Sequence, residues 1–153
     1  MSQENPHENP SHLAGHLTRD GHELSVRVYF EDTDFTGVVY HARYAQFFER
    51  GRSDFLRLKD INHDKLKNGL FGEPLYFIVK SIAIDFSAPA HIDDILQVET
   101  LVSSHKGARL AMHQKIRRGT QTIASADVVV VLIDENGKPK RLPDELIQAL
   151  VNS

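Results

Sequence analysis

The sequence predicts a single α+β domain in which an antiparallel β-sheet wraps around one long α-helix. One segment, about residues 41–59, repeats its apolar side chains at the 3.6-residue spacing of an amphipathic helix. Before and after it lie segments with the two-residue alternation of half-buried strands. Because one helix covers only one face of a sheet, the uncovered face or an edge strand is expected to pair with another copy of the chain.

Composition narrows the classes of function. The chain has 153 residues, enough for one domain, and a net charge of −3, which argues against nucleic-acid binding. It contains no cysteine, so disulfides, zinc–thiolate sites and cysteine nucleophiles are excluded. There is no apolar run long enough for a membrane span and no apolar signal-peptide core near residue 1. The expectation is a cytoplasmic protein without membrane insertion.

The first 21 residues are rich in Asn, Pro, His, Glu and Gly, which predicts a flexible N-terminal arm. His12 and His16 have the i, i+4 spacing of a metal-binding pair on a helix, but the composition favours a solvated polar tail, so no metal site is predicted. The folded domain is therefore assigned to residues 22–153, with order beginning near Leu24.

The first predicted strand and the helix follow directly. Residues 24–30 alternate apolar and polar side chains. The helix then carries an aromatic stripe, which consists of Tyr44, Phe47, Phe48, Gly51, Phe55 and Leu58. Gly51 lies within this stripe although a glycine in a helix costs about 0.8–1 kcal/mol relative to alanine. We expect the helix backbone to approach the sheet closely at this point.

The remainder of the chain predicts an irregular connection over about residues 62–74 and then four antiparallel strands. The strands are residues 75–86, 95–103, 109–118 and 122–134. In the first of them Ile78, Ile82, Ile84 and Phe86 are expected on one face. The unbroken apolar run from residue 128 to 133 is typical of a central strand. Pro143 predicts a short terminal helix over residues 144–151.

One stretch carries the chemical signal, RVYFEDTDFTGVVYHARYAQFFERGR at residues 27–52. Asp34 lies shortly before the predicted helix start. A carboxylate can attack a carbonyl carbon or deprotonate a water molecule. The first N–H groups of a helix have no intrahelical partner and carry partial positive charge, so they can stabilise an oxyanion. This arrangement indicates an enzyme with Asp34 at its centre. Asp32, two residues earlier, is interpreted as a turn acid.

The same stretch resembles the 4-hydroxybenzoyl-CoA thioesterase family of hotdog-fold proteins. The similarity lies in Arg27-Val28, Thr33-Asp34, Gly37-Val38-Val39 and Tyr44. The longer string EDTDFTGVVYHARYAQFFERGRSDFLR is similar to the YbgC-like acyl-CoA thioesterases associated with the Tol–Pal system. The resemblance spans about residues 24–150. It implies a hotdog fold, an acyl-CoA substrate, no cofactor besides the CoA of the substrate, and a homodimer or homotetramer with active sites between subunits.

The resemblance also implies roles for individual residues. Asp34 is the expected catalytic acid, as nucleophile or as general base. His41 is expected to act through its backbone N–H, with proton transfer by its side chain as the alternative. Glu49 is a second candidate acid, and its alternative is an i, i+3 pairing with Arg52. Substrate contacts are expected from Gly37, Val38, Tyr40 and Tyr44.

The phosphates of CoA require cations. The candidates are Lys115, Arg117 and Arg118 on one strand, and Lys138, Lys140 and Arg141 after the last strand. Solvation at a sheet edge is the alternative interpretation for both groups. Relatives of the family carry roughly Pro-Ala-Arg after the second strand, whereas here His91 follows Pro89-Ala90. An arginine at that position therefore cannot hold the nucleotide in this chain.

Two other classes of function remain as alternatives. A hotdog dehydratase or hydratase is ranked below a hydrolase, because Asp34 and His41 are seven residues apart within a thioesterase-type motif. A non-catalytic acyl-binding scaffold of the cell envelope, with acyl carrier protein as a partner, is the second alternative. Acyl chain length is left open, since it depends on packing between subunits.

Overall fold

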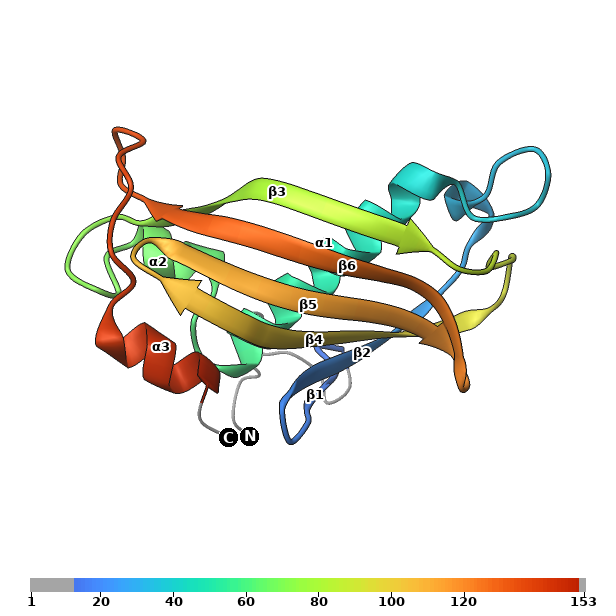
Figure 1. The fold of residues 1–153 in the computed structure, drawn as a ribbon, viewed down its shortest axis with the longest axis horizontal. Helices are drawn as coiled ribbons and strands as arrows, with labels where there is room; N and C mark the ends of the chain where they lie inside the picture. The colour runs from blue at the N-terminus through green and yellow to red at the C-terminus, as the bar shows by residue number, and fades with distance from the viewer. Residues whose placement is uncertain (1–12, 152–153) are drawn as a thin grey trace, which may run out of the picture.

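The computed structural model describes residues 13–151 and has one antiparallel sheet packed on one long helix (Figure 1). The helix α1, His41–Leu58, crosses behind the sheet. The sheet has six strands in the order β1-β2-β4-β5-β6-β3. The α+β prediction of a sheet around one long helix is confirmed. Within the described residues, no helix combines the length and apolarity needed to cross a membrane.

The last four strands occur where periodicity placed them. The first predicted strand, residues 24–30, instead spans Gly21–Arg27, because the chain turns into a 3₁₀ helix at Phe30, and a two-residue strand is added before it. Their bounds are β1 His16–Leu17, β2 Gly21–Arg27, β3 Tyr76–Phe86, β4 Ile95–Lys106, β5 Arg109–Arg118 and β6 Gln121–Ile133. A 3₁₀ turn, η1, spans Phe30–Asp32, and two short helices, α2 His63–Lys67 and α3 Asp144–Val151, complete the fold. The terminal helix was predicted, whereas α2 lies in a segment predicted to be irregular.

Order begins earlier than expected. Strand β1 pairs with β2, and Ala14 is buried against the body of the protein. His22 is also buried, and its Nε2 lies 2.6 Å from the carbonyl oxygen of Ala14. The expectation that order starts near Leu24 is therefore wrong. The rest of the predicted arm, including His12 of the possible metal pair, lies outside the described residues.

The core forms between the aromatic stripe of α1 and the inner face of the sheet. Phe47, Phe48 and Phe55 are fully buried there. Gly51 explains how the helix lies so close, because a Cβ atom at this position would be 2.8 Å from Val98 Cγ1 and 3.0 Å from Thr100 Oγ1. The expected close approach of the helix to the sheet is confirmed.

Strand β3 differs from the prediction in one respect. A bulge at Lys80 shifts the register, so that Val79 pairs with Val130 while Ser81 pairs with Val129. Ile78 lies opposite Val131 and faces away from the helix, whereas Ile82 lies opposite the core residue Val128. The expected common face of Ile78 with Ile82, Ile84 and Phe86 is therefore wrong for Ile78. An extra residue reverses the alternation of the strand.

Strand β6 lies between β5 and β3, as its apolar run predicted. Beyond it, β3 is the edge of the sheet. Val79, Ile82 and Phe86 are 50%, 38% and 53% exposed, although they share the inner side of the sheet with the core. Helix α1 crosses behind the sheet diagonally and passes β3 only towards the C-terminal end of that strand (Figure 1), so these side chains of β3 are incompletely covered within residues 13–151. An apolar edge strand is thus left open.

Candidate active site

The segment from Asp32 to Tyr40 folds into a narrow hairpin that leads into α1. The backbone N–H of Tyr40 donates to the carbonyl oxygen of Asp32 (3.0 Å), and Asp34 N–H donates to the carbonyl oxygen of Val38 (2.9 Å). Thr33 and Val39 form an antiparallel bridge between these two bonds. Gly37 has φ +85°, a value that glycine adopts without strain. Asp34 therefore projects from the tip of a hairpin whose base is the helix start.

The carboxylate of Asp34 is held in one orientation and kept ionised. Its Oδ1 accepts hydrogen bonds from the hydroxyl of Thr36 (2.5 Å) and from the Thr36 backbone N–H (2.8 Å). These two bonds, with the side-chain bond the larger effect, lower the pKa of Asp34 below its ordinary value of 3.8. Within the described chain, Oδ2 has no hydrogen-bond partner, so one oxygen of a charged carboxylate is open to a substrate.

Asp32 has the opposite environment. It is 3% exposed, and its Oδ2 accepts a hydrogen bond from the backbone N–H of Tyr29 (2.8 Å). Its Oδ1 lies 3.3 Å from Nε of Arg43. Asp32 thus brackets the η1 turn and ties it to the first turn of α1, as the turn-acid interpretation predicted.

Helix α1 begins at His41 with its N-terminus uncapped. The N-cap residue, Tyr40, is extended and makes no side-chain capping bond. Over residues 13–151 no acceptor contacts the backbone N–H of His41, so this donor is available to a ligand. The imidazole of His41 is exposed and lies against the ring of Tyr40, with 4.4 Å between centroids. In the described chain, the helix start therefore presents an unpaired backbone N–H, while the imidazole of His41 lies on the surface.

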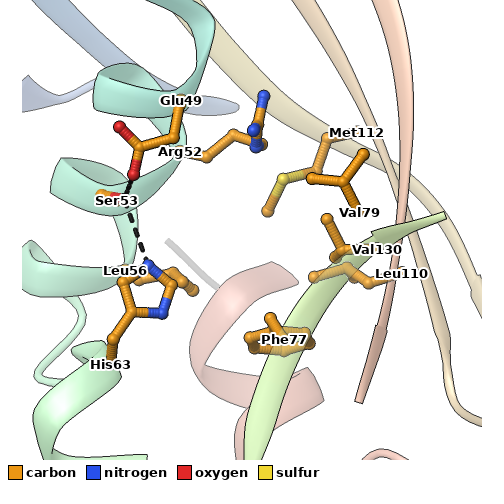
Figure 2. A pocket seen from close by; sticks show the side chains of 10 residues that line it. All are labelled: Glu49, Arg52, Ser53, Leu56, His63, Phe77, Val79, Leu110, Met112 and Val130. Carbon is orange, nitrogen blue, oxygen red and sulfur yellow. Dashed lines mark hydrogen bonds between the residues drawn. The ribbon is translucent and has the colours of Figure 1, made fainter. Parts of the chain in front are cut away.

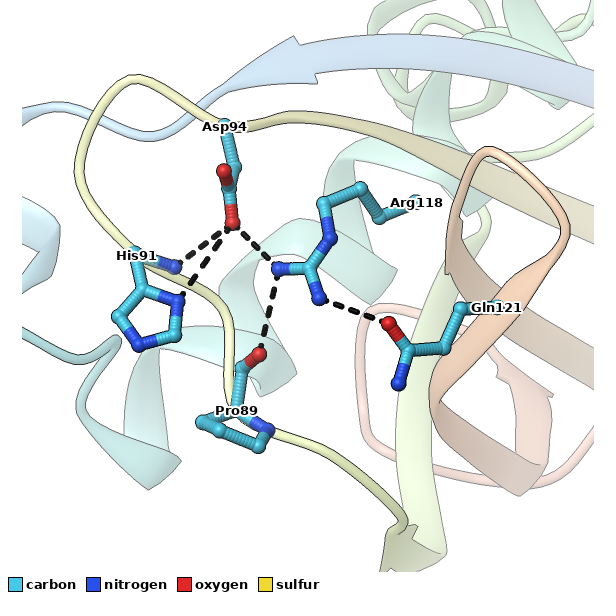
Figure 3. A network of polar contacts seen from close by, with 5 residues as sticks. All are labelled: Pro89, His91, Asp94, Arg118 and Gln121. Carbon is cyan, nitrogen blue, oxygen red and sulfur yellow. Dashed lines mark hydrogen bonds and ion pairs between the residues drawn. The ribbon is translucent and has the colours of Figure 1, made fainter.

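A second loop, whose polar contacts are shown in Figure 3, lies against the hairpin. The backbone N–H of Val39 donates to the carbonyl oxygen of Ala90 (2.9 Å), and Val38 bridges His91. Arg118, at the end of β5, fastens this loop through bonds to Asp94 (2.6 Å) and to the carbonyl oxygen of Pro89 (3.3 Å). Arg118 thus links the end of β5 to the loop that contacts Val39, just before the helix start.

Asp94 is the centre of that support. Its Oδ2 accepts from the His91 backbone N–H (2.9 Å) as well as from Arg118. Partial burial opposes ionisation, but these two donors outweigh it and lower the pKa of Asp94. The His91 imidazole lies 3.9 Å from the same oxygen. His91, which follows Pro89-Ala90, thus belongs to the support of the hairpin.

Tyr44 lies beneath the helix start rather than on its surface. It is 4% exposed and packs against Phe86, with 5.6 Å between ring centroids. Burial raises the pKa of its hydroxyl. Among the expected substrate contacts, Gly37 and Val38 are partly exposed in the hairpin and Tyr40 is exposed beside it. Tyr44 instead contributes a buried wall under these residues.

Glu49 is placed apart from the hairpin, two turns along α1. Its Oε1 accepts a hydrogen bond from Ser53 (2.8 Å), whose Oγ lies 3.1 Å from Nε2 of His63 on α2 (Figure 2). Arg52 instead donates to Gln114 (3.0 Å), so the alternative Glu49–Arg52 ion pair is not formed. Sequence reasoning missed Ser53 and His63. The i, i+4 spacing of Glu49 and Ser53 was a signal for the first, but His63 is brought in only by α2.

Two of the three candidate phosphate ligands on β5, Arg117 and Arg118, are engaged in ion pairs. Arg117 donates to Glu99 and to Glu23, each at 2.9 Å, on the face of the sheet away from α1. Arg118 is bound to Asp94 as described. Lys140 lies 3.7 Å from Glu73 and 3.9 Å from Asp134. No ion pair is formed by Lys115, Lys138 or Arg141 within the described residues.

The chain resembles known thioesterases over most of its length. Residues 28–150 match the thioesterase-like superfamily. The acyl-CoA thioesterase YbgC of Haemophilus influenzae is 44% identical over 128 residues, which cover 83% of this chain and 92% of the relative. The acyl-CoA thioester hydrolase YbgC of Escherichia coli O6:H1 is 39% identical over 124 residues, which cover 80% and 90%.

Solved structures agree with the fold. A probable thioesterase from Bartonella henselae superposes with a TM-score of 0.78 at 50% sequence identity, covering 80% of this chain and 99% of that one. A second structure, a 1,4-dihydroxy-2-naphthoyl-CoA thioesterase from Synechocystis, superposes with a TM-score of 0.75 at 25% identity, covering 84% and 93%. The hotdog fold implied by the motif is confirmed by these neighbours.

Proposed function

Because this chain belongs to the thioesterase-like superfamily, we propose that it hydrolyses acyl-CoA thioesters with Asp34 as the attacking carboxylate and the His41 backbone N–H as the oxyanion donor. Relatives named as acyl-CoA thioesterases at 39–44% identity support the reaction and the substrate class. The observation that carries the assignment of residues is a hairpin with an ionised carboxylate at its tip and an uncapped helix N-terminus at its base.

In the proposed first step, Oδ2 of Asp34 attacks the thioester carbonyl carbon, and the carbonyl electron pair moves onto oxygen. The His41 N–H and the positive end of α1 stabilise this oxyanion. One such donor is worth on the order of 10²–10³ in turnover. When the oxyanion collapses, the C–S bond breaks, CoA leaves as a thiolate that takes a proton from water, and a mixed anhydride remains on Asp34.

In the second step, water adds to the anhydride and releases the free acid, which restores the Asp34 carboxylate. We propose direct attack rather than general base catalysis because Oδ2 of Asp34 is open to the substrate. The hydrogen bonds from Thr36 also lower the pKa of Asp34, whereas an efficient general base has a pKa near the working pH. The ionised form required for attack is fully populated at neutral pH.

The proposal includes a second copy of the chain. Val79, Ile82 and Phe86 form an apolar stripe along the unpaired edge strand β3, and pairing of two such edges would extend the sheet and bury the stripe. Phe86 also touches Tyr44, below the helix start, so this interface would run beside the proposed site. A homodimer, or a homotetramer built from it, would close the acyl pocket between subunits.

The test of the reaction follows the release of free CoA thiol from acyl-CoAs of different chain length and from aromatic acyl-CoAs. We expect hydrolysis of at least one class with ordinary enzymatic turnover. Absence of hydrolysis across the whole panel, together with tight binding of acylated acyl carrier protein, would instead establish the scaffold function.

The order of steps has its own test. With direct attack by Asp34, rapid-quench experiments are expected to give CoA in a burst up to the enzyme concentration when anhydride hydrolysis is the slower step. Reduction of the quenched enzyme with borohydride would convert an Asp34 anhydride to homoserine, which mass spectrometry detects at this position. An unmodified Asp34 under conditions where a burst is observed contradicts the anhydride.

A further inference from the structure

A cavity of about 240 Å³ lies between α1, α2 and the inner face of the sheet, away from the Asp34 hairpin (Figure 2). One wall is apolar and comes from β3, β5 and β6. The other is polar and comes from the two helices, with Glu49 and Ser53 on α1 and His63 on α2. The apolar lining residues are Leu56, Phe77, Val79, Leu110, Met112 and Val130.

The hydrogen bonds along this polar wall run in one direction, from His63 through Ser53 to Glu49. Ser53 has a single hydroxyl proton, which it donates to Glu49 Oε1. The contact between Ser53 Oγ and His63 Nε2 therefore has the imidazole N–H as the donor. Within the described residues, the second carboxylate oxygen of Glu49 has no partner. The wall thus offers a ligand one charged acceptor whose orientation is fixed by a chain of two hydrogen bonds.

The charges around the cavity select the ligand. Glu49 repels an anion, and the guanidinium of Arg52, which also lines the cavity, repels a cation. A neutral ligand with a hydrogen-bond donor avoids both repulsions and can bond to the Glu49 carboxylate. An apolar cavity of about 150 Å³ is large enough for benzene, so this one accommodates a substituted six-membered ring or an aliphatic group of similar size.

We propose that this cavity binds a neutral molecule or acyl substituent with an apolar body and one hydroxyl group, and that Glu49 accepts the hydroxyl proton. The apolar body lies against β3, β5 and β6. The proposal concerns the cavity alone and holds whether or not Asp34 hydrolyses a thioester, so its failure and the failure of the proposed function are separate results.

The chain contains a natural probe for the test. It has two methionines, and Met112 projects from β5 into the cavity while Met1 lies outside the described residues. With ¹³C-methyl-methionine labelling, NMR titration follows the Met112 methyl signal directly. The ligands are p-cresol and toluene, which differ only in the hydroxyl group.

We expect p-cresol to shift the Met112 signal and to bind about tenfold more tightly than toluene, because a hydrogen bond to a carboxylate is stronger than one between neutral groups. In Glu49→Gln the preference is expected to fall to about threefold or less. Glu49 is exposed, so this variant keeps the fold. Glu135→Gln, an equal change on a distant exposed turn, is the matched control and should behave as wild type.

Any of three results would overturn the proposal. The first is a Met112 signal that moves with neither ligand up to their solubility limits, which means that the cavity does not bind molecules of this class. The second is equal affinity for p-cresol and toluene, and the third is a preference that is the same in Glu49→Gln as in wild type. Either of the latter outcomes removes Glu49 as the hydroxyl acceptor.

Discussion

Asp32 and Asp34 are two residues apart and yet have different functions available to them. Asp32 is buried. One of its carboxylate oxygens accepts a hydrogen bond from the backbone N–H of Tyr29, and the other forms an ion pair with Arg43. Asp34 uses one oxygen for Thr36 and leaves the other open. The burial of Asp32 fixes the turn, and the Thr36 bonds keep Asp34 ionised. Local hydrogen bonds, rather than position in the EDTD string, therefore distinguish the buried acid from the one that we propose as catalytic.

His22 predicts how stability depends on pH. It is 1% exposed, and its Nδ1 has no hydrogen-bond partner. Burial lowers its pKa below 6.5, so below pH 6.5 the unfolded chain binds a proton that the folded chain does not. The free energy of unfolding is expected to fall as the pH drops from 7 to 5. Chemical denaturation of His22→Gln should show a smaller fall than wild type. An identical fall in both proteins contradicts this account.

At the scale of elements, Gln114 joins helix α1 to the sheet. Its amide donates to the carbonyl oxygen of Phe48 and to Thr100 Oγ1 (both 2.9 Å), and accepts from the buried Arg52 (3.0 Å). Gln114→Met keeps the volume but leaves these groups unpaired. We expect a loss of about 3 kcal/mol in the free energy of unfolding, measured by urea denaturation.

The matched control for that variant is Gln97→Met. Gln97 is half-buried on the neighbouring strand β4 and makes no side-chain hydrogen bond within the described chain. Its replacement is expected to change stability by less than about 0.5 kcal/mol. Equal effects at the two positions would show that Gln114 does not act through its hydrogen bonds.

Arg118 predicts an effect on turnover through the second loop. Removal of its bonds to Asp94 and Pro89 in Arg118→Leu loosens the loop that holds Val39, just before the helix start. If Arg118 positions the oxyanion donor, kcat falls about tenfold with KM nearly unchanged, and Arg118→Lys restores part of it. A rise in KM alone would instead indicate direct contact with the CoA phosphates. Arg117→Leu, on the other face of the sheet, should leave kcat unchanged.

Sequence periodicity was sufficient for the long helix, the strands and the close approach at Gly51, because local alternation and one apolar stripe determine them. It failed at Lys80, where the alternation of LYFIVKSIAIDF continues through a bulge that only pairing with β6 reveals. It also missed Gln114, a polar side chain at an inward position, and β1, whose short pairing depends on contacts with β2. The motif predicts Asp34 and His41 as site residues from local sequence, whereas the environment of Glu49 depends on α2, a tertiary contact.

For the whole molecule, the open edge of β3 predicts assembly. We expect sedimentation velocity to give two or four copies per particle. Ile82→Asp places a charge in the apolar stripe, and the desolvation cost of that charge should shift the protein to a monomer. Leu70→Asp, an equal change on an exposed loop, is the control and should leave the assembly intact. A wild-type protein that is monomeric at micromolar concentration contradicts pairing through β3.

The central claim is that one open, ionised carboxylate performs the reaction. Its most direct test is the rate of CoA thiol release by Asp34→Asn beside Glu31→Gln, which removes an equal charge from an exposed residue of the same segment. We predict that Asp34→Asn lowers kcat at least about 10³-fold with an unchanged circular dichroism spectrum, while Glu31→Gln stays within about twofold of wild type. Full activity in Asp34→Asn would contradict the account.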